Sequence, residues 1–297
     1  MRRSIPGSRR AMSSPAALAG RGVLRRALRH PSFASGGALT LLLVGVAALS
    51  LAWTPHSAYL IQVRQRLLPP SGLHWLGTDT LGRDVLSMLM VGAQNSIMVG
   101  VVAVSIGLTA GVALGLLAAA RRGWVEEAVM RLADFGFAFP AILLAILFTA
   151  VFGPSAVNAI IAIGIFNVPV FARIGRAAAN VVWAREFVLA ARAAGKGRLR
   201  ITLEHVLPNI LPILVVQATI QFAIAILAEA ALSYLGLGTQ PPNPSWGRML
   251  NEAQTMIFTA PLLAVFPGIA IALSVLGLNL MGDGLRDLVD PRLARAR

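Results

Sequence analysis

Residues able to carry acid–base or metal chemistry are few and dispersed in this chain. Cysteine is absent, and the four histidines are far apart in the sequence: His30, His56, His74 and His205. Neither an H-E-x-x-H nor a G-x-S-x-G motif occurs, so metal-dependent or serine hydrolysis within a membrane lacks its residues. The Gly-Lys-Gly segment at 195–197 lacks the Ser or Thr and the earlier Gly of a phosphate-binding loop. The sequence therefore predicts a chain that hydrolyses no ATP and holds no cofactor of its own.

A second group of polar residues lies inside apolar segments. Gln217, Gln221 and Glu229 fall in one such segment, and Asn167 falls in another. An ionisable or amide side chain at membrane depth is unfavourable unless it faces protein or water. Two interpretations follow: these side chains line a polar pathway, or they form structural hydrogen bonds between helices. Proton coupling through Glu229 would make the chain a secondary transporter, which is a competing hypothesis.

The elements that must position these residues are apolar helices. Of the 297 residues, 57% are hydrophobic and 13% are charged, which leaves too little polar surface for a soluble globule of this size. A helix needs about 20 apolar residues to cross a hydrocarbon core of about 30 Å. The segments that meet this requirement are 35–53, 96–120, 135–152, 157–172, 210–235 and 261–281. We therefore expect an all-α integral membrane protein with six transmembrane helices.

The distribution of positive charge predicts the orientation of these helices. Of the 26 Lys and Arg residues, 22 fall in four segments: 1–34, 121–131, 173–208 and the C-terminal tail. Positive loops are retained in the cytoplasm, so both termini are expected there, and the net charge of +14 requires no nucleic acid partner. The predicted units are a basic cytoplasmic tail (1–34), a first transmembrane helix with an external segment (35–94), a transmembrane core (95–285) and a cytoplasmic C-terminal tail (286–297).

Small residues recur on one face of the second predicted span. Gly107, Gly111 and Gly115 are spaced by four, which places three bare patches above one another on a helix. Such a face lets another helix approach closely. The partner helix could belong to this chain or to another subunit, and packing within the chain is the interpretation that we favour.

The two external segments are rich in turn and capping residues. In the longer one, Thr78 or Asp79 could cap a following helix, and Asp79 and Arg83 would then form an ion pair one turn apart. This pattern alone predicts a capped helix on the surface. In the second external segment, Trp246 suits the membrane interface.

The cytoplasmic insertion between the fourth and fifth spans predicts a short helix. No helix-breaking residue occurs at 184–194, and Gly195 suits the position just past a helix C-terminus. Ala190 and Ala191 give this helix little bulk, so it could fit into a cleft on another protein. An amphipathic helix on the membrane surface is the alternative.

This insertion resembles the cytoplasmic EAA loop of binding-protein-dependent ABC importer permeases, whose pattern is E-A-A-x3-G-x9-I-x-L-P. The residues that match are Ala190, Ala191, Gly195, Leu207 and Pro208. Leu189 replaces the Glu of the pattern, and His205 replaces the Ile. The segments that resemble the dipeptide/oligopeptide (peptide/nickel) branch are GTDTLGRD (77–84), AEAALSYLGLG (228–238), PPNPSWG (241–247) and NLMGDGLRD (279–287). The resemblance covers nearly everything from 37 to 293.

The resemblance implies the type I ABC importer permease fold, with 95–285 as the permease core and 173–208 as its EAA-like loop. In that family the loop helix docks in a groove of a cytoplasmic ATPase, a second permease supplies the other half of the pathway, and an external binding protein delivers the substrate. ATP and magnesium would bind to the two ATPase partners. The residues to which the resemblance assigns docking are Glu186, Leu189, Ala190, Ala191, Arg192, Gly195 and Lys196. Because Leu189 departs from the pattern, Glu186, one turn earlier, is the candidate for its electrostatic contact.

The resemblance also indicates a substrate class and a location. It favours the C-type subunit of a dipeptide or oligopeptide importer in the inner membrane of a bacterium. Similar permeases serve nickel chelates, glutathione or other small solutes, and the external binding protein sets much of the selectivity. No residue of the predicted spans has a chemistry that demands a peptide.

Overall fold

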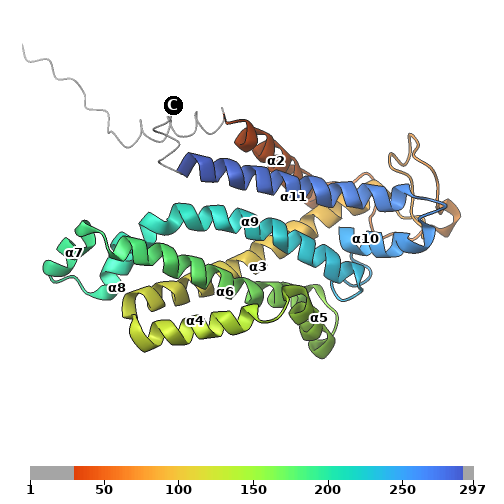
Figure 1. The fold of residues 1–297 in the computed structure, drawn as a ribbon. Helices are drawn as coiled ribbons and strands as arrows, with labels where there is room; N and C mark the ends of the chain where they lie inside the picture. Colours follow the sequence, from red (N-terminus) through yellow and green to blue (C-terminus); the bar gives the residue numbers. More distant parts are fainter. Residues whose placement is uncertain (1–29, 290–297) are drawn as a thin grey trace, which may run out of the picture.

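Long apolar helices dominate the computed structural model, which describes residues 30–289 (Figure 1). Five helical stretches are long and apolar enough to cross a membrane: α2 (Pro31–Ala52), α3 (Val85–Arg121), α6 (Ala156–Trp183), a continuous helix at 198–234 that contains α9 (Leu207–Tyr234), and α11 (Leu262–Val289). Each agrees with a span predicted from the sequence. The tail at 1–29 and residues 290–297 lie outside the described residues.

The third predicted span is wrong as a single helix. The segment at 135–152 is divided between α4 (Gly123–Phe137) and α5 (Ala141–Phe152), whose axes differ by 83°. Pro140 stands at the break, where it lacks a backbone N–H and disfavours a helical residue before it. The 12 residues of α5 rise only about 18 Å, so α5 cannot cross the hydrocarbon core alone.

Several predicted boundaries also move, because helices continue into segments expected to be loops. The predicted loop at 121–131 is mostly α4, which begins two residues after α3 ends. The fourth span continues past residue 172 to Trp183, with Pro169 inside the helix. The predicted loop at 173–208 therefore holds the end of α6, then α7 (Glu186–Ala193), α8 (Arg198–Ile201) and a π-helical turn, η2 (Thr202–Val206).

The core of the bundle is built on the contact between α3 and α6. A Cβ atom on Gly107 would lie 2.2 Å from Asn167 Cβ, and one on Gly111 would lie 2.5 Å from the Val168 carbonyl oxygen. Both distances are too short for any side chain, so the glycine face of α3 lies directly against α6 of the same chain. Gly115 packs in the same way against Ala172. This is the packing within the chain that the sequence favoured.

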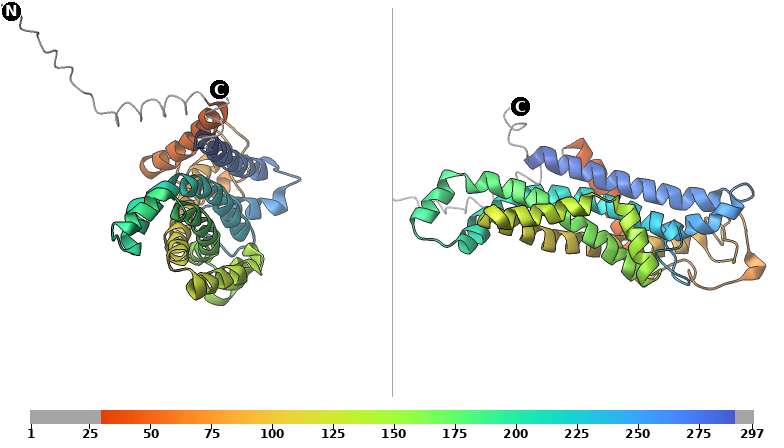
Figure 2. Two further views of the ribbon diagram at one scale, coloured as in Figure 1. Left: turned by 60° about the vertical axis from the view of Figure 1, so that its left-hand side comes forward. Right: turned by 60° about the horizontal axis from the view of Figure 1, so that its bottom comes forward.

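The two ends of the bundle carry different short elements (Figures 1 and 2). α7 and α8 lie at one end, beyond the tips of α6 and α9. The remaining short elements are η1 (Val63–Gln65), α10 (Trp246–Ala253) and η3 (Gln254–Met256). α10 and the segment that joins α2 to α3 lie at the opposite end. The candidate functional residues fall at these two ends and on α6 and α9 between them.

Candidate functional site

The short helix α7 ends as its sequence predicts. Gly195 has φ of +80°, a conformation that favours glycine. The Gly195 N–H donates to the Arg192 carbonyl at 3.0 Å, and the Lys196 N–H donates to the Ala191 carbonyl at 3.1 Å. These two bonds form a Schellman motif, which satisfies the last carbonyls of α7 and turns the chain sharply toward α8.

One face of α7 packs on its own chain and the other is exposed. The Val188 side chain is fully buried, and Ala191 is only 9% exposed. On the opposite side Leu189 is 51% exposed, and Glu186 and Ala190 are also exposed. Among residues 30–289, Glu186 makes neither an ion pair nor a side-chain hydrogen bond. The two neighbouring alanines therefore differ: Ala191 lets α7 approach the bundle, whereas Ala190 is open to a partner.

Lys196 is tied back to the chain instead of extending outward. Its Nζ atom lies 2.6 Å from Glu204 Oε2 and 3.1 Å from His205 Nε2. Arg200 Nε donates to the other oxygen of the same carboxylate at 2.6 Å. These contacts hold the turn after α7 against η2. Because η2 continues directly into α9, the position of α7 is linked to that long helix.

The amide groups inside the bundle lie between α6 and α9. Gln221 Nε2 donates to Asn167 Oδ1 at 3.2 Å, and both side chains are buried. Gln217, one turn earlier on α9, is half-buried. The Asn167 side chain also lies against Gly107 of α3, so this hydrogen bond forms where three helices meet.

Glu229 is buried near the end of α9 that faces α10. Its side chain is 1% exposed, and its Oε1 atom accepts hydrogen bonds from Ser233 Oγ at 2.6 Å and Thr239 Oγ1 at 3.3 Å. Oε2 is buried without a hydrogen-bond partner among the described residues. The donors belong to its own helix and to the loop that follows. Glu229 thus joins the end of α9 to that loop.

The segment before α3 is not the capped surface helix that the sequence predicted. Asp84 caps α3, and its side chain accepts from the Ser87 N–H at 2.8 Å. Asp79 and Arg83 do form the expected pair, with Arg83 Nε 2.6 Å from Asp79 Oδ2, but they lie in a buried turn. The sequence prediction failed because Glu252 of α10, which is far along the chain, also binds Arg83.

A network of charged residues holds this turn against α10. The Arg83 guanidinium, 6% exposed, contacts Asp79 at 2.6 Å and Glu252 at 2.5 Å. Burial alone would lower the pKa of Arg83, but the charges of Asp79 and Glu252 outweigh it and raise that pKa. Arg248 donates to the second oxygen of Glu252 at 2.8 Å. The four residues form what we call the Arg83 network.

Trp246 also departs from its predicted place at the membrane interface. It begins α10, is 2% exposed, and donates from Nε1 to the Leu89 carbonyl at 3.0 Å. Gly92 of α3 leaves room for the indole, because a Cβ atom there would lie 2.6 Å from Trp246 Cδ1. The indole therefore anchors α10 to α3.

Two histidines that are distant in the sequence meet at one carboxylate. His74 Nδ1 lies 2.9 Å from Asp84 Oδ1, and His56 Nδ1 lies 3.6 Å from the same oxygen. Burial would raise the pKa of Asp84, but hydrogen bonds from His74 and Ser87 outweigh it and lower that pKa. His56 and His74, which are far apart in the sequence, are therefore close together in the structure. Sequence spacing gave no signal of their contact, because the connecting segment has irregular structure.

A large apolar cavity of about 1130 Å³ opens between α3 and the helix at 198–234. Side chains of α2 and α11 complete its wall. Among the described residues, the charged ones in the lining are Arg121 and Arg198, both at the end that carries α7. The remaining surface of the cavity is almost entirely hydrocarbon.

Residues 111–295 match the family described as "binding-protein-dependent transport system inner membrane component". The chain belongs to this family. Among characterised relatives, the permease is 47% identical to the dipeptide transport system permease protein DppC of Alkalihalophilus pseudofirmus, over 77% of this chain and 75% of the relative. It is 45% identical to the di/tripeptide transport system permease protein DppC of Pseudomonas aeruginosa, over 90% of both chains. It is 41% identical to the glutathione transport system permease protein GsiD of Pectobacterium atrosepticum, over 91% and 90%.

A solved structure places the permease in the expected fold class. A chain of the inward-facing MetNI methionine ABC transporter superposes with a TM-score of 0.57 and 20% identity, covering 68% of this permease and 97% of that chain. The permease therefore has the type I ABC importer permease fold and is a membrane subunit of an ABC importer.

Proposed function

We propose that this permease forms half of the translocation pathway of an ATP-driven importer of dipeptides or oligopeptides, as its C-type subunit. The observation that carries the proposal is the 45% identity over 90% of the chain to a relative that is named a di/tripeptide permease. The glutathione permeases among the relatives support a second candidate, since glutathione is itself a small peptide. Uptake of labelled dipeptide would be measured in the reconstituted transporter with unlabelled glutathione as competitor, and uptake of labelled glutathione with unlabelled dipeptide. The substrate that is taken up and competes more strongly would distinguish the two candidate functions.

The proposal assigns ATP hydrolysis to partner subunits. Two cytoplasmic ATPases would bind ATP and magnesium, an external binding protein would deliver the peptide, and a second homologous permease would complete the pathway. In this arrangement both termini and α7 face the cytoplasm of a bacterium. The isolated chain should then hydrolyse no ATP, and measurable ATPase activity of the purified permease would contradict the assignment.

The exposed face of α7 is the proposed contact with an ATPase. Closure of the ATPases on ATP would push on α7, and the helix at 198–234 would carry this movement into the bundle as an alternating-access change. Glu186 supplies a charge and Leu189 an apolar contact on this face, so Glu186 can replace the Glu that Leu189 displaces. Lys196 and Gly195 would fix the direction of α7, and the Arg192 side chain is exposed in its last turn.

Two adjacent alanines provide a matched test of this contact. A thiol introduced by Ala190→Cys should crosslink to an ATPase subunit in the assembled transporter, because Ala190 is exposed. The same change at Ala191, which packs on its own chain, should crosslink far less. If an active transporter gives no crosslink from Ala190→Cys, the docking assignment is wrong.

The apolar cavity is the proposed contact with the second permease. Its lining is hydrocarbon except near Arg121 and Arg198, so it suits the apolar surface of another helix better than a hydrated peptide. A cysteine at exposed Val101 in this lining should crosslink to the second permease. A cysteine at Phe258, which is 98% exposed outside the cavity, is the control.

A further inference from the structure

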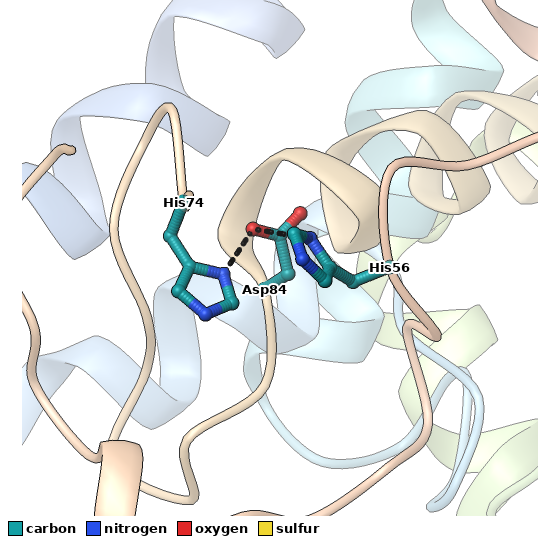
Figure 3. A group of neighbouring side chains, drawn as sticks. All are labelled: His56, His74 and Asp84. Atoms are coloured by element: carbon teal, nitrogen blue, oxygen red, sulfur yellow. Dashed lines mark hydrogen bonds and ion pairs between the residues drawn. The ribbon is translucent and has the colours of Figure 1, made fainter. Parts of the chain in front are cut away.

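Three side chains with metal-binding atoms converge at the end of the bundle that carries α10 (Figure 3). His56 follows α2, His74 lies in the segment between η1 and α3, and Asp84 is the N-cap of α3. One ligand atom from each lies within 4.8 Å of the other two. Figure 3 shows both imidazole rings turned toward the Asp84 carboxylate. Three separate segments therefore supply one possible donor set.

Two of the three distances between these atoms are close to those around a tetrahedral ion. Zinc bonds to His nitrogen and carboxylate oxygen at about 2.0–2.2 Å, which sets neighbouring ligand atoms about 3.4 Å apart. Asp84 Oδ1 lies 2.9 Å from His74 Nδ1 and 3.6 Å from His56 Nδ1, one distance slightly shorter and the other slightly longer. The third pair, one nitrogen from each imidazole, lies within 4.8 Å, so binding a metal would require the two rings to move toward the tetrahedral spacing.

Surrounding groups hold the three ligands in the orientation that a metal requires. Gln65 Oε1 lies 3.1 Å from His74 Nε2 and can accept a hydrogen bond from it, so a bound metal would take the place of the proton on Nδ1, the nitrogen that faces Asp84. Ser87 binds Asp84 Oδ2 through both its N–H, at 2.8 Å, and its hydroxyl, at 2.7 Å, so Oδ1 remains directed at the histidines. The backbone N–H of His56 donates to Ser87 Oγ at 3.0 Å, which holds the chain at His56 close to Asp84. These are outer contacts of the kind that orient metal ligands.

Hydrogen bonding alone does not account for His56. Its Nδ1 atom is buried and has no hydrogen-bond partner among the described residues. The 3.6 Å to Asp84 Oδ1 is too long for a hydrogen bond. A polar nitrogen so placed, facing a carboxylate and a second imidazole, lacks the one interaction that a cation between the three groups would supply.

We propose that His56, His74 and Asp84 bind a divalent transition-metal ion of the zinc type. Two imidazole nitrogens and one carboxylate oxygen suit zinc, whereas magnesium and calcium prefer oxygen ligands alone. The His56 side chain is 35% exposed, so the site lies near the protein surface, and a water molecule would complete the tetrahedral ligand set. The bound ion would connect the chain after α2, the segment before α3 and the start of α3 itself. It would thus fix the end of the bundle opposite α7.

Metal stoichiometry tests this site independently of transport. The full-length permease, purified in nanodiscs without a histidine tag and stripped with a chelator, is dialysed against Zn²⁺ with excess Mg²⁺, and bound zinc is measured by mass spectrometry. We expect one zinc per chain, with at least a tenfold loss in His56→Gln and in His74→Gln. The matched control His205→Gln, which changes a histidine near α7, should keep one zinc. Co²⁺ in place of Zn²⁺ should give visible absorption bands that the His56→Gln variant lacks.

The opposite results are equally clear. If the unmodified permease binds no more zinc than the double variant of His56 and His74, the site does not exist. Equal loss in His205→Gln would also overturn it, because binding would then be unspecific. Should His74→Gln misfold, His56→Gln still decides, since the His56 side chain makes no hydrogen bond within the described chain. These experiments measure zinc binding and not peptide uptake. A negative result would therefore exclude the metal site without affecting the proposed transport function.

Discussion

The two ends of the helix bundle treat their polar residues in opposite ways. At the end that carries α10, Arg83 is buried between Asp79 and Glu252, with each contact supplied by this chain. At the other end, α7 exposes Glu186 and Leu189, and Glu186 has no ion-pair partner among the described residues. The Arg83 network is formed entirely within this chain, whereas α7 leaves Glu186 and Leu189 exposed at the face that we propose for docking. Substitutions should therefore affect folding at the first end and coupling at the second.

The largest effect is expected from Arg83→Ala. This change leaves the buried Asp79 without its cation and removes one of the two arginines that bind Glu252, and breaking a buried pair typically costs about 3–5 kcal/mol. Thermal unfolding in detergent, followed by size-exclusion chromatography, would measure the loss. Arg131→Ala is the control, because its pair with Glu127 is solvent-exposed and should contribute within about 0.5 kcal/mol. Equal melting temperatures for the two variants would remove the contrast between the ends.

Gly111→Ala should have the next largest effect, and it tests whether the ends are joined by a tightly packed bundle. The new methyl group would lie 2.5 Å from the Val168 carbonyl oxygen, so α3 and α6 must separate at a cost of about 1–3 kcal/mol. Gly45→Ala in α2 meets no atom within 4 Å and should be neutral or slightly stabilising. The same unfolding assay compares them. A neutral Gly111→Ala would mean that the two helices can shift apart freely.

Two neighbouring residues of α7 distinguish its attachment from its coupling. Val188→Ala removes two buried methyl groups and should destabilise the permease by about 1.6 kcal/mol. Leu189→Ala changes an exposed side chain and should alter stability by less than about 0.5 kcal/mol. In the assembled transporter, however, Leu189→Ala should lower substrate-stimulated ATP hydrolysis. Unchanged coupling together with unchanged stability would show that the exposed face of α7 contacts nothing.

The smallest effect is expected from Glu229→Gln, which tests the alternative of proton coupling. An amide at this position can still accept from Ser233 Oγ, so the loop after α9 should stay in place. ATP-driven uptake should change by less than about threefold. Uptake is measured with and without a proton gradient. Loss of gradient-driven uptake by the isolated chain in this variant would instead favour a secondary transporter.

The sequence predicted those features of the molecule that are specified by residues close together in the chain. The end of α7 was predictable because helix formers followed by Gly195 specify a local stop, and the Schellman motif at that position confirms it. The face formed by Gly107, Gly111 and Gly115 was predictable because the helical period alone aligns them. The break at Pro140 was not predicted, since the apolar composition on both sides favours one continuous span.

The other end was poorly predicted because its structure depends on distant partners. Asp79 and Arg83 show the spacing of a surface pair, and only Glu252, on another helix, makes them a buried network. His56 and His74 likewise lie in an irregular segment, whose sequence has no periodicity from which their contact could be predicted. Trp246 was assigned to the membrane interface because Trp is common there. The sequence does not show that Gly92, on another helix, leaves space for the indole.

The continuous helix from 198 to 234 has a consequence for the size of the movements in this permease. Its 37 residues span about 55 Å, from the turn held by Lys196 to the loop held by Glu229. If a rigid helix of this length tilts by only about 10° about one end, its other end moves by about 10 Å. If α7 is the ATPase contact, as we propose, a peptide-sized opening would require only a small rotation there.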